Sequence, residues 1–205
     1  MGKYLTRLET DFISKTIDPS NPGAIIDVGA EAGRFSMMAA NSNYAVTAID
    51  IDSYSLRRLK LKNKNVTVIQ ADARKIPFKS DSFDGVIMVE VLDYIPQLED
   101  ALSECHRILK LNAPLVLSFG NKSSFKAKLR ALQGKSYLHS YRKVTQCLVQ
   151  TGFKVTARLG YSWLPFGRTS QSRLLPILAG AEKVFGLRRI PRLSPWVILS
   201  ASKSE

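Results

Sequence analysis

The sequence predicts an α/β fold in which strands and helices alternate along the first half of the chain. Short runs rich in β-branched residues are followed by stretches with helical apolar spacing, which is typical of parallel strands joined by crossover helices. A length of 205 residues and a hydrophobic content of 45% favour one domain with a sizeable core. The chain has no apolar run of the roughly 18 residues that a spanning helix needs, so we expect a soluble protein.

Five β-rich runs in the first half are expected to be strands, and three helical stretches lie between them. The expected strands are residues 24–29, 44–50, 65–70, 83–90 and 113–119, and the expected helices lie near 32–41, 53–63 and 97–110. In the second half, residues 140–152 predict a helix with Val144, Cys147 and Leu148 on one face. Residues 153–161 and 196–203 predict two further strands.

Basic residues are concentrated in the second half of the chain. Residues 1–120 contain 14 Lys and Arg against 15 Asp and Glu, whereas residues 121–200 contain 15 Lys and Arg against Glu182 alone. Such a surplus is usually a solvated surface, but gathered on one part of a fold it attracts phosphates, nucleic acid or anionic lipid headgroups. Cys105 and Cys147 form no close-spaced pair and the chain starts without an apolar leader, so we expect reduced thiols in a cytoplasmic protein.

Four consecutive predicted strands end in acidic or glycine-rich groups. These are Asp27 with the turn from Gly29 to Gly33, then Asp50, then Asp72 with Ala73, and then Glu90 with Asp93. In an open parallel sheet, ligands bind outside the carboxyl ends of the strands, and an acid at the end of the second strand can accept both ribose hydroxyls. Because few cations accompany these acids, the edge favours a nucleoside over a nucleotide with a pyrophosphate.

The runs "DVGAEAGRFS", "VTAIDID", "VIQADARKIPFKSDSFDGVIMVEVLDYI" and "ALSECHRILKLNAPLVLSFGN" resemble class I S-adenosylmethionine-dependent methyltransferases in order and spacing. The resemblance covers roughly residues 24–121 and continues more weakly through "LVQTGFKV" and "WVILSASK". It implies a three-layer, Rossmann-like α/β sandwich with a seven-stranded, mostly parallel sheet whose last strand is antiparallel. With the single domain that the length favours, we expect one methyltransferase domain over residues 1–205. The stretch at about 161–194, between the last two strands, is basic and apolar and far longer than a hairpin loop, so we expect an ordered insertion.

The resemblance further implies S-adenosyl-L-methionine as cofactor and a role for each strand end. The implied cofactor contacts are Asp27, Gly29, Ala30, Glu31 and Gly33 at the methionine end, Asp50 on the ribose, Ile51 on the adenine face, Asp72 and Ala73 on the adenine edge, and Glu90.

Glu31 departs from the turn of this family, which has Gly at the middle position. A sulfonium nucleoside is positively charged and has no phosphate, so the turn needs close backbone approach more than an anion cradle, and a nearby acid is tolerable. If residue 31 adopts a positive φ, Glu there costs about 1 kcal/mol or more. Glu31 and Arg34 also argue against a nicotinamide cofactor, because the Gly-x-Gly-x-x-Gly pattern needs Gly at both positions.

His139 and Tyr141 are candidate acceptor-facing residues, since the family often places such groups just before this helix. An imidazole is suited to general-base chemistry near neutral pH. The alternative, which we slightly favour, is an aromatic anchor beneath a loop. Glu90, Asp93 and Tyr94 resemble the Glu-x-x-Glu-His segment of some quinone-pathway methyltransferases, but Tyr94 replaces the histidine and we predict no metal.

The expected type of acceptor is inferred from the insertion, which combines large apolar residues with Arg188, Arg189 and Arg192. This combination fits a segment that lies on an anionic membrane, and it fits equally an ordinary lid over the substrate pocket. We therefore expect a small-molecule acceptor, with a lipid-linked one and a peripheral membrane location as its extension. An RNA methyltransferase using the basic half is the second hypothesis, and a catalytically silent cofactor-binding protein is the third. The sequence does not indicate an oligomeric state.

Overall fold

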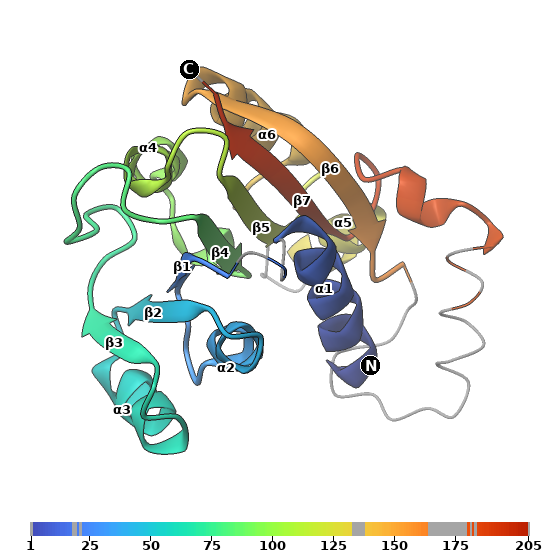
Figure 1. Ribbon diagram of the computed structural model, residues 1–205. Helices are drawn as coiled ribbons and strands as arrows, with labels where there is room; N and C mark the ends of the chain where they lie inside the picture. The colour runs from blue at the N-terminus through green and yellow to red at the C-terminus, as the bar shows by residue number, and fades with distance from the viewer. Residues whose placement is uncertain are drawn as a thin grey trace.

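The computed structural model describes residues 2–17, 20, 22–132, 138–163, 180, 182 and 184–204, except for the side chains of residues 3 and 130 (Figure 1). In chain order, its elements are α1 (Gly2–Thr16), β1 (Ala24–Val28), α2 (Arg34–Asn41), β2 (Ala45–Asp50), α3 (Ser53–Lys62), β3 (Thr67–Gln70), β4 (Gly85–Val89), η1 (Leu92–Tyr94), α4 (Leu98–Ile108), β5 (Pro114–Gly120), α5 (Phe125–Ala131), α6 (Tyr141–Gln150), β6 (Phe153–Tyr161), η2 (Leu187–Arg189) and β7 (Trp196–Lys203).

The seven strands form one sheet in the order β3-β2-β1-β4-β5-β7-β6. Neighbours from β3 to β5 pair in parallel, whereas β7 pairs antiparallel with both β5 and β6. The expected seven-stranded sheet with an antiparallel last strand is therefore confirmed. The strand order reverses at β1 and β4, and in open α/β sheets this is where ligands bind.

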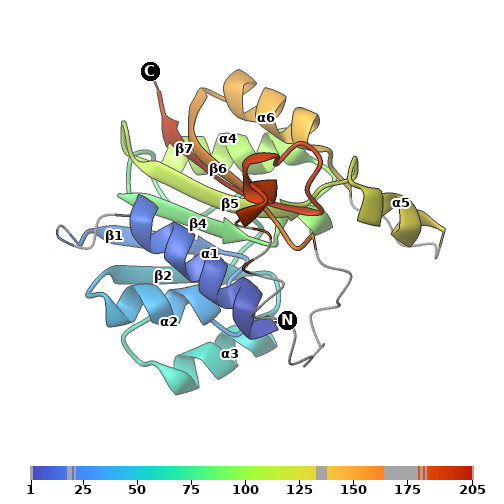
Figure 2. The ribbon, with the colours of Figure 1, turned by 90° about the vertical axis from the view of Figure 1, so that its right-hand side faces the viewer.

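Helices cover both faces of the sheet, which gives the expected three layers (Figure 2). On one face, α4 and α6 pack against the sheet with Leu98, Leu102 and Cys147 among their buried residues. On the other face lie α1, α2 and α3. Adjacent residues of the central strands are consequently buried on opposite faces, as with Ile25 and Ile26. Continuous apolar runs of this kind are what a doubly covered parallel sheet requires.

Two helices of the structure were not expected from the sequence, namely α1 and α5. Buried apolar residues of α1, including Leu5, Leu8 and Ile13, recur at helical spacing and pack on the sheet. That spacing was a usable signal in the sequence. By contrast, α5 has seven residues, which is too short for periodicity to indicate it.

The expected insertion is described only in part, because residues 164–179, 181 and 183 lie outside the described residues. Its described portion includes Glu182, the one acid between residues 121 and 200. The Glu182 side chain is buried, where Oε2 accepts a hydrogen bond from the Tyr4 hydroxyl at 2.8 Å and Oε1 accepts one from the Trp163 backbone N–H at 2.8 Å. The carboxylate therefore ties the insertion to α1 and to the residues after β6.

Asn121 joins three segments at the carboxyl end of β5. Its side-chain amide donates to the carbonyl oxygens of Arg192 at 2.9 Å and Ser194 at 3.0 Å. Its side-chain oxygen accepts from the backbone N–H groups of Ser123 and Tyr141, each at 3.1 Å. Because Asn121 is fully buried, water cannot replace its side chain as the hydrogen-bond partner of these four backbone groups.

Replacing Asn121 with Ala should destabilise the fold by about 3 kcal/mol or more, because several buried backbone groups would lose their hydrogen-bond partners. Urea unfolding measures the change in the free energy of unfolding. Asn41→Ala is the matched control, since Asn41 is exposed at the end of α2 and should change stability by no more than about 0.5 kcal/mol. Equal effects of the two substitutions would show that Asn121 does not join these segments.

Candidate functional site

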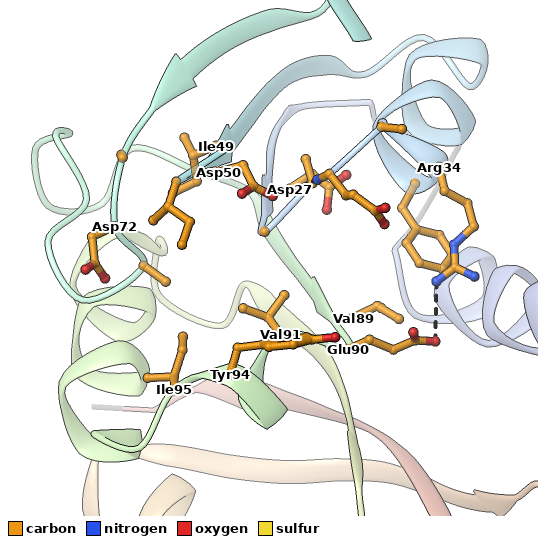
Figure 3. Close-up of a pocket in the computed structure, with 18 of the residues that line it drawn as sticks. Asp27, Arg34, Ile49, Asp50, Asp72, Val89, Glu90, Val91, Tyr94 and Ile95 are labelled. Atoms are coloured by element: carbon orange, nitrogen blue, oxygen red, sulfur yellow. Dashed lines mark hydrogen bonds and ion pairs between the residues drawn. The ribbon is translucent and has the colours of Figure 1, made fainter. Parts of the chain in front are cut away.

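A cavity of about 910 Å³ lies at the carboxyl ends of β1, β2 and β4 (Figure 3). Val91, Tyr94 and Ile95 face Asp50 and Asp72 across it. Most of the expected cofactor contacts line this cavity, namely Asp27, Gly29, Ala30, Glu31, Asp50, Ile51, Asp72, Ala73 and Glu90. Gly33 is the one expected contact residue outside the lining. The separate strand ends thus meet at a single site.

The turn after β1 has positive φ angles at Gly29 (70°), Glu31 (48°) and Gly33 (81°). A Cβ on Gly29 would lie 2.4 Å from Cγ2 of Val91, and one on Gly33 would lie 2.1 Å from Cδ1 of Leu59. Gly29 is therefore needed for close approach beside the cavity. Gly33 serves a different purpose, because it lets the start of α2 pack against α3.

The φ of Glu31 is 48°, which lies in the left-handed region. The backbone strain expected for a Glu at this position is therefore present. Glu31→Gly should therefore be more stable than Glu31→Ala by about 1 kcal/mol, after the greater unfolded-state entropy of Gly has offset part of the relief. Both variants lack the carboxylate, so the comparison isolates the backbone effect. Urea unfolding measures it, and an Ala variant as stable as the Gly variant would refute the strain.

Asp50, at the end of β2, is held by two loops. Its Oδ2 accepts the backbone N–H of Glu31 at 2.8 Å, and its Oδ1 accepts that of Asp52 at 2.9 Å. The next residue, Ile51, is 70% exposed and lines the cavity. Asp52 instead caps α3 by accepting the backbone N–H of Tyr54. The two neighbouring acids thus have separate tasks, and only Asp50 presents its carboxylate to the cavity.

Asp72, after β3, forms an ion pair with Arg74 within the cavity wall. The guanidinium donates from NH2 to Asp72 Oδ2 at 2.6 Å and from Nε to Oδ1 at 3.0 Å, while its NH1 donates to Gln97 at 2.9 Å. These hydrogen bonds lower the pKa of Asp72, so the carboxylate is ionised at neutral pH. Arg74 and Gln97 both line the cavity, and neither was expected there from the sequence.

Asp27 is buried at the base of the cavity. The Ser36 hydroxyl donates to Asp27 Oδ2 at 2.5 Å. Burial raises the pKa of Asp27 to about 6, although the hydrogen bonds from Ser36 and the charge of Arg34 act in the opposite direction. A buried carboxylate of this kind is most easily kept ionised by a nearby positive charge.

Asp27→Asn should remove a pH-dependent loss of stability. Because folding raises the pKa of Asp27, the contribution of this carboxyl group to the free energy of unfolding is fully present below pH 3.8 and is lost as the pH rises through about 6. By pH 8 the parent protein has lost about 3 kcal/mol of stability in this way, and the variant has not. Urea unfolding of cofactor-free protein from pH 4 to 8 measures the difference, with the exposed Asp11→Asn as control. Parallel pH profiles of parent and Asp27→Asn would contradict the raised pKa.

Arg34 lies between two carboxylates at the other end of the cavity. Its NH1 is 3.3 Å from Oε2 of Glu9, and its NH2 is 3.5 Å from Oε1 of Glu90 (Figure 3). Glu9, on α1, is fully buried and also accepts the Tyr161 hydroxyl at 2.8 Å. Glu90 has a φ of 66°, which is a strained conformation for this residue. Arg34 thus contacts an acid of α1 and the acid that follows β4, and of these three residues Arg34 and Glu90 line the cavity.

The structure places His139 and Tyr141 outside the cavity lining. His139 is buried, and its Nε2 lies 2.8 Å from the carbonyl oxygen of Ile95, which does line the cavity. The Tyr141 hydroxyl accepts a hydrogen bond from Arg158 at 3.1 Å. His139 thus contacts a residue of the cavity wall without lining the cavity itself. The catalytic roles of His139 and Tyr141 stay predictions.

The residues that line this cavity lie within a stretch that is similar to known methyltransferases. Residues 26–117 match the model of a family described as "Methyltransferase domain". The chain is 31% identical over 53% of its length to 24-methylenesterol C-methyltransferase 3 of Arabidopsis thaliana, and it covers 32% of that protein. It is 28% identical over 90% of its length to malonyl-[acyl-carrier protein] O-methyltransferase of Methylococcus capsulatus, and it covers 69% of that protein.

A solved structure shares the fold over nearly the whole chain. The crystal structure of a SAM-dependent methyltransferase from Methanosarcina mazei superposes with a TM-score of 0.71 at 16% identity, over 94% of this chain and 97% of the other. At this identity the likeness concerns the fold. It agrees with the sequence match, since both include the strands whose ends form the cavity.

Proposed function

We propose that the protein is an S-adenosylmethionine-dependent methyltransferase whose acceptor is a small molecule of lipid or lipid-linked type. The match of residues 26–117 to a methyltransferase domain supports the reaction type. The observation that carries the proposal is the acidic edge formed by Asp27, Asp50, Asp72 and Glu90, which face one cavity from four consecutive strands. Asp72 and Glu90 are paired with Arg74 and Arg34. The lining nevertheless contains five acids, with Glu31 included, against Arg34, Lys62 and Arg74, and this balance suits a cationic nucleoside better than a pyrophosphate.

The cavity residues fit S-adenosylmethionine at each end. A volume of about 910 Å³ lies in the range of small-molecule sites. Asp50 would accept the ribose hydroxyls, Ile51 would pack on the adenine, and Asp72 would accept the adenine amino group. Glu90 and the turn from Asp27 would surround the methionine end. The bound cofactor supplies an activated methyl group on sulfur, so the protein needs chiefly to align the acceptor with it.

A lipid-type acceptor is supported by the relatives and by the sequence of the insertion. One relative is named for a methylenesterol and another for malonyl-[acyl-carrier protein]. The chain covers about a third of the sterol enzyme, so the acceptor of that protein is no more than a guide. RNA is the second candidate acceptor, because residues 121–200 contain 15 Lys and Arg against Glu182 alone.

Asp50→Ala should weaken S-adenosylmethionine binding by about tenfold to a hundredfold, because hydrogen bonds to a charged acceptor contribute roughly 1.5–3 kcal/mol. Calorimetry measures the dissociation constant. Asp52→Ala is the matched control, since Asp52 caps α3 outside the cavity lining and should cost about 1 kcal/mol of stability with affinity unchanged. Unchanged affinity in a folded Asp50→Ala protein would remove the ribose assignment.

The class of the protein can be tested with S-adenosylmethionine, S-adenosylhomocysteine and NAD in parallel calorimetry. We expect both adenosyl ligands to bind and NAD not to bind, because Glu31 and Arg34 stand where a dinucleotide turn needs Gly. Transfer of a labelled methyl group to host lipid and RNA extracts then identifies the acceptor. Label in the lipid fraction supports the proposal, label in RNA favours the second candidate, and cofactor binding without transfer favours a catalytically silent protein.

A further inference from the structure

Large exposed apolar side chains gather at one side of the molecule. Fourteen such side chains are exposed among the described residues, and eight of them fall in two short segments. The first segment, at and after α5, exposes Phe125, Leu129, Leu132 and Leu138, and the second, before β7, exposes Val184, Phe185, Ile190 and Leu193. Phe125, Leu132, Val184 and Phe185 are between 73% and 84% exposed. Scattered single residues of this kind are ordinary, but a concentration of them marks an interaction surface.

Asn121 connects the two segments at one edge of the sheet, and we treat them together as one face. Its side chain donates to the carbonyl oxygens of Arg192 and Ser194, directly before β7, and Asn121 itself lies four residues before α5. The backbone N–H of Lys122 also donates to the carbonyl oxygen of His139 at 2.9 Å, which brings Leu138 beside the same connection. Figure 2 shows α5 projecting beyond the sheet at the edge where β5 ends and β7 begins.

The charged side chains of the two segments are all basic. Lys122, Lys128, Arg189 and Arg192 are exposed. The only acid between residues 121 and 200 is Glu182, which is buried and accepts hydrogen bonds from Tyr4 and Trp163. Cations among exposed apolar side chains are complementary to a surface that has anionic headgroups above a hydrocarbon layer.

We propose that this face, formed by residues 122–132, 138 and 184–193, docks on an anionic lipid membrane. Six of its eight exposed apolar side chains are aliphatic, and these cannot stack on nucleic-acid bases. Among the described residues, no helix is long and apolar enough to cross a bilayer. The inference extends the proposed function, because a lipid-type acceptor would be met at such a surface.

The face also lies next to the cavity. Asp93, in η1, accepts the backbone N–H of Gly120 through both carboxylate oxygens at 3.1 and 3.2 Å, and Gly120 precedes the connecting Asn121. His139 contacts the carbonyl oxygen of Ile95 in the cavity wall. The cavity and the face therefore share one edge of the sheet, and an acceptor in a bilayer would approach the cavity along that edge.

Vesicle sedimentation of the full chain tests the face, with phosphatidylcholine vesicles that either contain or lack phosphatidylglycerol. We expect binding to the anionic vesicles alone, and weaker binding as salt rises from about 0.1 M to about 1 M, where the Debye length falls from about 10 to 3 Å. Replacing Lys122, Lys128, Arg189 and Arg192 together by Gln should weaken binding about fivefold for each cation, or several hundredfold in all.

The matched control removes four cations from the other half of the chain, with Arg57, Arg58, Lys64 and Lys79 replaced by Gln. These residues are exposed and lie outside the cavity lining, so vesicle binding should change little. The pair Phe125→Ser and Phe185→Ser should weaken the binding that persists at high salt. Cofactor affinity, measured by calorimetry on every variant, verifies that each one folds.

Equal losses in the two charge variants would overturn the proposed face, since the attraction would then follow net charge alone. Absence of vesicle binding in a parent protein that binds S-adenosylmethionine would overturn it too and leave the methyltransferase proposal standing. RNA retention that is lost with Lys122, Lys128, Arg189 and Arg192, without vesicle binding, would assign the face to nucleic acid. Vesicle binding by a protein that binds no cofactor would instead overturn the proposed function and keep the face.

Discussion

The carboxylate of Asp50 holds two loops of the cavity together, and the rest of the site depends on this contact. It accepts N–H groups from Glu31, in the turn after β1, and from Asp52, at the start of α3. Glu31 has a positive φ, and its N–H is directed toward Asp50. The turn therefore keeps a strained glutamate where glycine would be relaxed, and the backbone stays close to the cavity.

The sequence predicted the sheet and the edge at which the cavity lies, because both follow from local patterns. The strands at 153–161 and 196–203 have the same bounds in the structure, and the strand expected at 44–50 begins one residue later. Asp50 and Asp72 could be placed because the end of a parallel strand fixes which edge of the sheet a residue occupies. The strand expected at 83–90 ends at Val89, since Glu90 turns away with a φ of 66°.

Contacts between distant segments were beyond the reach of the sequence. Glu9 and Tyr161 are 152 residues apart, and no spacing rule indicates that they meet beside Arg34. The same holds for the contact between the His139 ring and the Ile95 carbonyl oxygen, which the position of His139 before a helix does not indicate. Such polar groups are placed by tertiary packing, so local patterns carry little information about them.

A crystal structure of the chain with S-adenosylhomocysteine would test the central claim most directly. The account predicts the ribose hydroxyls within about 2.6–3.2 Å of the Asp50 carboxylate, with the adenine against Ile51 and the amino-acid end near Glu90. The hydrogen bonds from Glu31 and Asp52 to Asp50 should be unchanged. A ligand whose ribose lies away from Asp50, or a nucleoside bound in the reverse direction, would contradict it.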